Sequence, residues 1–245
     1  MDQVALFIDF ENLAVGAKEN LPPQADPVPF HALELLCRKY GNTSVRRAYA
    51  DWTSLRSSGR QQDLALNGID LIQVTRFGAN QKNAADMRIA VDAMEVLFTR
   101  AEIASFVLVT GDSDYAPLVM RLREYGKYVV GVGTQASASQ RLVAVCSEYK
   151  YWGTLVAEVD PEVRKIVGKR FHIADAEQWV RAALEERPDG SAPGAWLKQR
   201  MRTLSPSFDE RNYGCQTFRE FLERLPHLVR IELVQASDMQ VVLLR

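Results

Sequence analysis

The sequence of 245 residues has few of the residue types that most often form crosslinks or bind zinc. It contains three cysteines and three histidines. Cys37, Cys146 and Cys215 lie far apart, form no CxxC pair and fit no zinc spacing, and their odd number argues against a disulfide framework. We therefore expect buried, unreactive thiols in a reducing compartment, and we place the protein in the cytoplasm.

Long apolar runs and a large net charge are also missing. No run approaches the ~18 residues that a membrane span needs. The first residues, "MDQVALFID", begin as a strand and lack the pattern of a signal peptide. The formal net charge is -1, so the chain as a whole gives no sign of a nucleic-acid partner, and any basic surface must be local. With 47% hydrophobic and 25% charged residues, we expect a globular protein with one large or two smaller domains.

What the first two-thirds of the sequence do have is alternation. Short apolar or β-rich runs alternate with segments of helical periodicity, which predicts a parallel sheet covered by helices on both faces. The predicted strands are 4–9, 45–51, 69–75, 106–110 and 128–132. The predicted helices are 30–40, 54–67, 85–100, 115–125 and 137–149. Three of the strands are almost wholly apolar, which is typical of central strands buried on both faces.

The order of predicted helices and strands changes after a charged, proline-containing connector. Three helices are predicted at 174–187, 194–204 and 216–225, and two β-rich runs follow at 228–234 and 239–244. Three helices followed by a hairpin form the outline of a winged helix. We therefore predict an α/β domain over 1–155, a linker over 156–172 and a small α+β winged-helix domain over 173–245.

Aspartates follow two of the predicted central strands. Asp9 ends "VALFID", and Asp112 and Asp114 follow "FVLVT". Ligands of an open α/β sheet bind beyond the carboxyl ends of the strands, where the strand order reverses, so these side chains converge if the two strands are neighbours. Asp86 begins a long predicted helix in "QKNAADMRIAVD" and is the fourth candidate. Asp86 and Asp112 could each also be a helix cap.

Carboxylates that share one pocket repel one another unless they take up protons or bind a cation. Oxygen ligands suit Mg²⁺ or Mn²⁺, whereas zinc would favour histidine or cysteine. We therefore expect Asp9, Asp86, Asp112 and Asp114 to hold one or two such ions. Ions of this kind orient a phosphodiester, deprotonate a water and stabilise the leaving oxygen.

Three separated motifs resemble a known family. "FIDFEN", "KNAADMRIAVD" and "TGDSDYAPL", in that order and spacing, are similar to the motifs of NYN domains, which are PIN-like ribonuclease domains of the kind found in LabA-like bacterial proteins. "AYADW" at 48–52 resembles a further segment of that group, and the resemblance covers about residues 3–155. It implies a PIN-like fold with a central parallel sheet of order 3-2-1-4-5 and metal-dependent cleavage of RNA.

The resemblance also assigns roles to individual residues. It places Asp9, Asp86, Asp112 and Asp114 in the acidic site, as catalytic residues and metal ligands. The supporting positions are Asn12, Ser113, Asp92 and Lys82. From the residues alone, Asn12 could instead close a turn, Lys82 could be a solvated lysine, and Asp92 lies six residues beyond Asp86, off its helix face.

The C-terminal segment, about 173–245, resembles a LOTUS (OST-HTH) domain through "FDERNYGCQTFREFLERLPHLVRI". This resemblance implies a winged helix that binds RNA or a protein partner. In the same segment, Lys198, Arg200, Arg202 and Arg211 form a locally basic stretch. It could contact phosphates, or it could be a solvated helix face.

These features favour a metal-dependent ribonuclease that uses Mg²⁺ or Mn²⁺, with a C-terminal module that presents RNA or recruits a partner; a homodimer is a further expectation. The alternative is an RNA-binding regulatory adaptor with a weak or inactive pocket, and the four aspartates argue against it. A phosphatase of the haloacid dehalogenase type would need DxD after the first strand, where this chain has "DFEN". Five arginines could guide a negatively charged strand toward the site: Arg46, Arg47, Arg56, Arg60 and Arg76.

Overall fold

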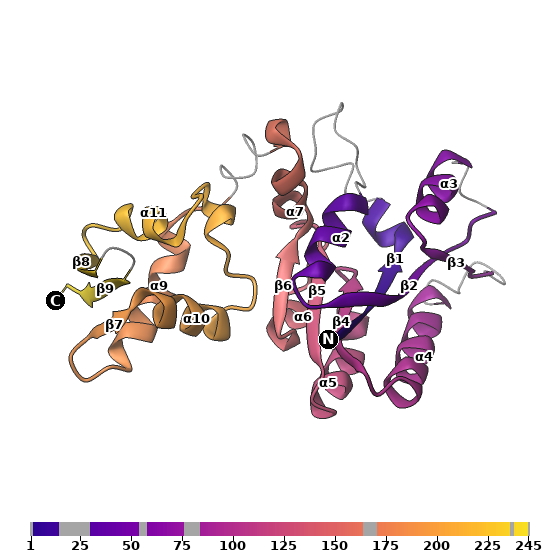
Figure 1. Cartoon of the computed structure of the whole chain (residues 1–245), viewed down its shortest axis with the longest axis horizontal. Helices are drawn as coiled ribbons and strands as arrows, with labels where there is room; N and C mark the ends of the chain where they lie inside the picture. Colours follow the sequence, from indigo (N-terminus) through magenta and orange to yellow (C-terminus); the bar gives the residue numbers. More distant parts are fainter. Residues whose placement is uncertain are drawn as a thin grey trace. The chain divides into compact units, whose positions relative to one another are not determined.

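The computed structural model describes residues 2–14, 30–53, 58–75, 84–163, 171–235 and 238–244. Lys82, Arg56 and Arg76 lie outside these residues. The chain divides into two compact units, Met1–Val159 and Asp160–Arg245 (Figure 1). In the described part of the chain, no helix combines the length and the apolar character that crossing a bilayer requires.

The first unit is built on a six-stranded sheet of order β3-β2-β1-β4-β5-β6, in which all neighbours pair parallel. The strands are β1 (Gln3–Asp9), β2 (Asn42–Ala50), β3 (Asp70–Gln73), β4 (Ile103–Val109), β5 (Tyr128–Gly133) and β6 (Glu148–Tyr151). This order confirms the predicted PIN-like α/β fold and adds a sixth strand at one edge. Because the order reverses between β1 and β4, the switch point lies at the carboxyl ends of these two strands.

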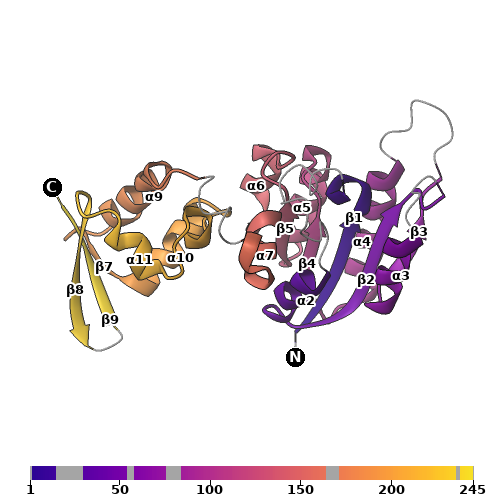
Figure 2. The same ribbon diagram turned by 90° about the horizontal axis from the view of Figure 1, so that it is seen from above.

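Helices cover both faces of this sheet (Figure 2). They are α2 (Phe30–Arg38), α3 (Ser58–Leu66), α4 (Ala84–Thr99), α5 (Ala116–Glu124), α6 (Gln140–Val145) and α7 (Trp152–Val159), with a 3-10 turn η1 (Ser113–Tyr115) before α5. Helices α4, α5 and α6 share one apolar core with the strands, while α2 and α7 pack together on the opposite face.

The central strand β1 shows how the sequence positions the site. Every residue from Val4 to Ile8 is at most 3% exposed, as expected of a strand covered on both faces. Ala5 and Phe7 belong to the core under α4 and α5. Since side chains alternate along a strand, Asp9 points to that same face, toward the start of α4.

One predicted helix is wrong in its second half. The segment 137–149 contains the short helix α6, which ends at Val145, and the start of strand β6. In β6, Glu148 and Lys150 alternate with Tyr149 and Tyr151, and this period of two favours a strand. Because the apolar residues of α6 are followed almost directly by those of β6, the sequence pattern does not show where the helical period ends and the strand period begins.

The second unit is a winged helix, as predicted. Its elements are α9 (Ala174–Glu185), β7 (Ser191–Pro193), α10 (Gly194–Leu204), η2 (Glu210–Tyr213), α11 (Phe218–Glu223), β8 (Val229–Gln235) and β9 (Asp238–Leu243). The strands form an antiparallel sheet of order β7-β9-β8. Strand β7 was not predicted, because three residues are too short to show an alternating pattern. Aromatic rings of Phe208, Tyr213, Phe218 and Phe221 pack in the core of this unit.

Candidate metal centre

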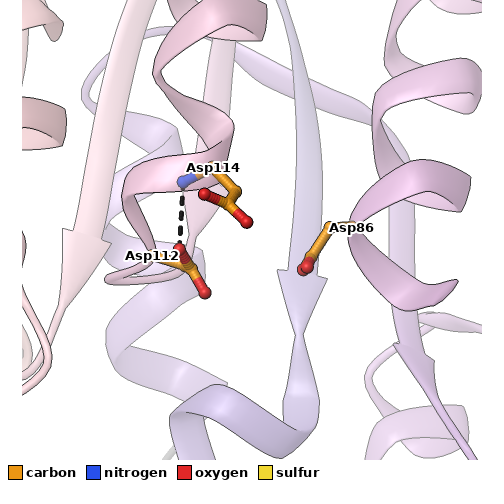
Figure 3. A group of neighbouring side chains, drawn as sticks. All are labelled: Asp86, Asp112 and Asp114. Atoms are coloured by element: carbon orange, nitrogen blue, oxygen red, sulfur yellow. Dashed lines mark hydrogen bonds between the residues drawn. The ribbon is translucent and has the colours of Figure 1, made fainter. Parts of the chain in front are cut away.

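Three carboxylates meet at the carboxyl edge of the sheet. Asp86 lies in the first turn of α4, whereas Asp112 and Asp114 lie in the turn that follows β4. One carboxylate oxygen from each residue lies within 4.8 Å of the others, and Figure 3 shows Asp86 reaching across toward the other two. Asp86 and Asp112 are half-buried and Asp114 is exposed. The group is therefore open to solvent on one side.

Local hydrogen bonds fix the shape of the turn after β4. Asp112 Oδ1 accepts a bond of 2.9 Å from the backbone N–H of Asp114, so the expected helix cap is present. The backbone N–H of Asp112 in turn donates to Thr110 Oγ1. Ser113, between the two aspartates, is half-buried. Capping thus holds the two carboxylates side by side.

Gly111 lets this turn pack closely against the segment after β5. A Cβ atom at this position would lie 2.4 Å from the backbone oxygen of Ser137, which is far inside van der Waals contact. The Gly111 carbonyl also accepts a hydrogen bond of 2.9 Å from the N–H of Ser139. The close approach therefore requires glycine.

Asn12 joins the end of β1 to the turn after β4. Its backbone N–H donates to Asp9 Oδ1 at 3.1 Å, and its side-chain oxygen accepts from the N–H of Gly111 at 3.2 Å. Asn12 therefore closes the turn after Asp9 and also connects that turn to the loop of the acidic group. The two interpretations of this residue are compatible.

Asp9 connects to the three-carboxylate group through Tyr115. The Tyr115 hydroxyl donates to Asp9 Oδ2 at 3.4 Å and is also hydrogen-bonded to Asp86. Asp9 is only 6% exposed. Burial raises the pKa of Asp9 to about 7, and the charges of Asp86 and Glu11 add to this effect, while the N–H of Asn12 opposes it.

The same forces act on Asp86. Burial raises its pKa, and the nearby charges of Asp112 and Asp114 raise it further, while the hydrogen bond from Tyr115 works in the opposite direction. Tyr115 itself is buried, and burial together with the two carboxylates raises the pKa of its hydroxyl. The phenol therefore stays a proton donor between Asp9 and Asp86. Our sequence reasoning missed Tyr115, although an aromatic residue directly after "DSD" was a usable signal.

The chemistry of this group fits a hard divalent cation. All its donors are carboxylate oxygens, the ligands that suit Mg²⁺ and Mn²⁺. A bound cation would also reduce the repulsion that raises the pKa of Asp86. The arrangement can therefore hold a cation at the rim of the sheet.

Asp92 lies apart from this group. Its carboxylate accepts from Tyr49 at 2.8 Å and from Arg88 at 2.9 Å, and Arg47 lies at 3.4 Å. Asp92 is 5% exposed. These contacts connect the middle of α4 to β2, so the structure places Asp92 in a buried ion-pair network.

The remaining arginines expected near the site have other partners. Arg46 donates to the carbonyl of Asn67, which precedes the amino end of β3 and so lies away from the acidic rim. Arg60 lies 4.0 Å from Asp63.

In the second unit, three of the four basic residues singled out from the sequence bind acids of that unit. Lys198 Nζ lies 2.6 Å from Glu210, Arg200 lies 2.6 Å from Glu186, and Arg211 binds Asp209 through two nitrogens. Arg202 differs, because its Nε atom is buried without a hydrogen-bond partner among the described residues.

Comparisons with known proteins agree with this architecture. The search of curated proteins found no match. A solved structure of a protein of unknown function from Vibrio parahaemolyticus RIMD 2210633 is 22% identical, with a TM-score of 0.50, over 60% of this chain and 91% of that chain. At this identity the likeness shows the fold alone. The family model of the OST-HTH/LOTUS domain matches residues 172–238, and that of the NYN domain matches residues 3–153. The chain therefore belongs to the NYN-domain family, a group with a PIN-like nuclease fold, and carries an OST-HTH/LOTUS domain after it.

Proposed function

We propose that this protein is a metal-dependent ribonuclease whose acidic group binds Mg²⁺ or Mn²⁺. The observation that carries the proposal is the meeting of Asp86, Asp112 and Asp114 oxygens within 4.8 Å at the switch point of the sheet. Membership of a PIN-like nuclease family supports a phosphodiester substrate, and the OST-HTH/LOTUS domain supports RNA as the molecule that contains this phosphodiester.

The chain's own residues bind and orient in this proposal. Asp86, Asp112 and Asp114 hold the cation, which when bound supplies positive charge for the phosphodiester and lowers the pKa of water. Tyr115 orients Asp86 through its hydroxyl, and Asp9 accepts from the same hydroxyl. Asp9 thus acts on the group through Tyr115, and Asn12 connects the turn after β1 to the turn after β4.

The test is cleavage of single-stranded and structured RNAs in Mg²⁺, in Mn²⁺ and in EDTA. We expect metal-dependent cleavage by the wild type and a loss of about 100-fold or more in Asp112→Asn, because a metal ligand should matter at least as much as the partners around it. The asparagine oxygen can still cap the turn, so folding should be retained. Asp70→Asn is the matched control, since Asp70 is exposed at the amino end of β3.

Each outcome decides between the proposal and its alternative. Equal cleavage by the wild type and Asp112→Asn would contradict the proposal that this acidic group is the catalytic site. Metal binding and RNA binding by a wild type that cleaves none of the RNAs would favour the regulatory adaptor.

A further inference from the structure

Helix α4 is apolar on two opposite sides. Its inner side is buried in the core of the first unit through Ile89, Ala93, Val96 and Leu97. Its outer side carries Met87, Val91 and Phe98, which are 66%, 61% and 63% exposed. A helix with apolar residues all round is normally buried, and contiguous exposed apolar surface marks a site of interaction.

The outer residues have the spacing of a coiled-coil seam. Met87, Val91, Met94 and Phe98 are separated by four, three and four residues, and we call them the outer seam. Alternating steps of three and four keep one stripe of side chains facing a partner helix. Met94 is half-buried against the core and the other three are exposed. The helix therefore presents a stripe suited to another helix.

We propose that the outer seam binds the same seam of a second copy of this chain, with the two α4 helices antiparallel. In this register Met87 lies opposite Phe98 of the second copy, and Val91 lies opposite Met94. Such a contact is isologous: the same surface of both copies takes part, so Met87 of each copy contacts Phe98 of the other. This inference concerns a surface other than the acidic group and does not depend on the proposed function.

Charges beside the seam favour this occupant and this direction. Arg88 and Glu95 flank the same side of the stripe, seven residues apart. Although Arg88 also binds Asp92 and Glu95 lies 4.0 Å from Arg47, their side chains remain 56% and 62% exposed. In an antiparallel pair, Arg88 of each copy lies opposite Glu95 of the other copy, which gives two symmetric pairs of opposite charge. In a parallel pair Glu95 would instead face Ala90, which offers no charge. The seam is thus electrostatically complementary to its own copy.

Neighbouring features suit a contact at this place. Phe98 packs edge-on against Tyr125, which is 51% exposed, so the seam widens at its C-terminal end. Ala90 is small, which permits close approach of two helix backbones beside the seam. Met87 directly follows Asp86, so a second copy on the seam would border the acidic group.

Sedimentation equilibrium of the full chain over a range of concentrations tests the proposal. We expect a species of twice the 27.6 kDa chain mass for the wild type. Val91→Glu should weaken this dimer at least about 10-fold, because it buries a charge in the seam. Leu66→Glu is the matched control: Leu66 is 78% exposed on α3 and should leave the dimer unchanged. A monomeric wild type, or equal behaviour of the two variants, would overturn the proposal.

Disulfide trapping tests the register separately. In the antiparallel pair, the double variant Met87→Cys with Phe98→Cys should crosslink two copies on oxidation, whereas Met87→Cys alone should not, and these positions are too far apart along α4 to bridge within one chain. The native thiols give little background, since Cys37, Cys146 and Cys215 are buried. Crosslinking by the single variant, or none by the double variant, would overturn the antiparallel register.

Discussion

At the scale of single residues, Tyr115 is the least expected part of the site. Its hydroxyl lies between Asp9 and Asp86, whose pKa values are both raised mainly by burial. One hydroxyl thus contacts a buried carboxylate, Asp9, and a half-buried one, Asp86. The sequence predicted the carboxylates from strand ends and helix starts, but it does not show which side chains meet across the sheet, so the aromatic residue after "DSD" was not assigned a role.

Tyr115→Phe should therefore weaken cation binding without emptying the core. The ring stays and the hydroxyl is lost, so Asp86 loses an orienting partner and Asp9 retains, among the residues that the structure describes, its bond from Asn12. We expect affinity for Mn²⁺ to fall about 10-fold, the effect typical of a residue that orients a ligand. Calorimetric titration measures this, with Tyr125→Phe as control. Unchanged affinity would exclude the positioning role.

Asp9→Asn should change how stability depends on pH in the metal-free protein. The folded-state pKa of Asp9 is raised to about 7 from 3.8, so the folded protein binds the proton more tightly than the unfolded chain does. Stability from this group is then present at low pH and is lost as pH rises from about 4 to about 7. Asparagine does not ionise and has no such loss.

The melting temperature in EDTA at pH 5 and pH 8 measures this effect. From pH 5 to pH 8, the free energy of unfolding of the variant should rise relative to that of the wild type by a few kcal/mol, at ~1.4 kcal/mol per pKa unit. The melting temperature of the variant should rise relative to the wild type accordingly. Any constant cost of the amide cancels in this comparison. Parallel pH profiles would mean that Asp9 is ionised normally in the folded protein.

At the scale of elements, the apolar runs predicted the central strands because burial on both faces leaves little choice of residue type. Strand β6 was missed since its four residues continue the spacing of α6, and β7 is shorter still. The meeting of Asp112 with Asp86 followed from topology: β1 and β4 are neighbours, and α4 starts over their shared end. The ion pairs of Asp92 depend on tertiary packing, which no short motif specifies.

Gly111→Ala tests how far the turn after β4 depends on close packing. The added Cβ meets a backbone oxygen at 2.4 Å, and backbone cannot rotate away as a side chain can. We expect a loss of about 1–3 kcal/mol of stability and weaker Mn²⁺ binding, because Asp112 must shift. Urea unfolding and metal titration provide the two measurements. Wild-type values in both would show that the turn adapts at no cost.

At the scale of the whole molecule, the two units divide the work that we propose between an acidic group and a winged helix. From the sequence, the basic residues of the second unit could contact phosphates or could form a solvated helix face. Three of the four pair with acids of that unit, and Glu210, the partner of Lys198, is 7% exposed. Lys198→Ala would leave this carboxylate buried and unpaired, so it reports on folding more than on RNA.

Arg202, for which the described residues show no acidic partner, is a better probe of RNA binding by the second unit. Arg202→Gln should weaken RNA retention and lower the salt slope by about one, as for the loss of one phosphate contact. Filter binding at two salt concentrations measures both, and Arg200→Gln, which removes a residue already paired with Glu186, is the control. If the two variants retain RNA equally well, the winged helix would be assigned to protein docking.

The central claim is that Asp86, Asp112 and Asp114 share a divalent cation. Anomalous X-ray scattering from crystals soaked in Mn²⁺ tests it most directly. The account predicts a strong manganese peak among these three carboxylates, and its loss in crystals of Asp112→Asn. A fully soaked crystal with no peak between them would contradict it.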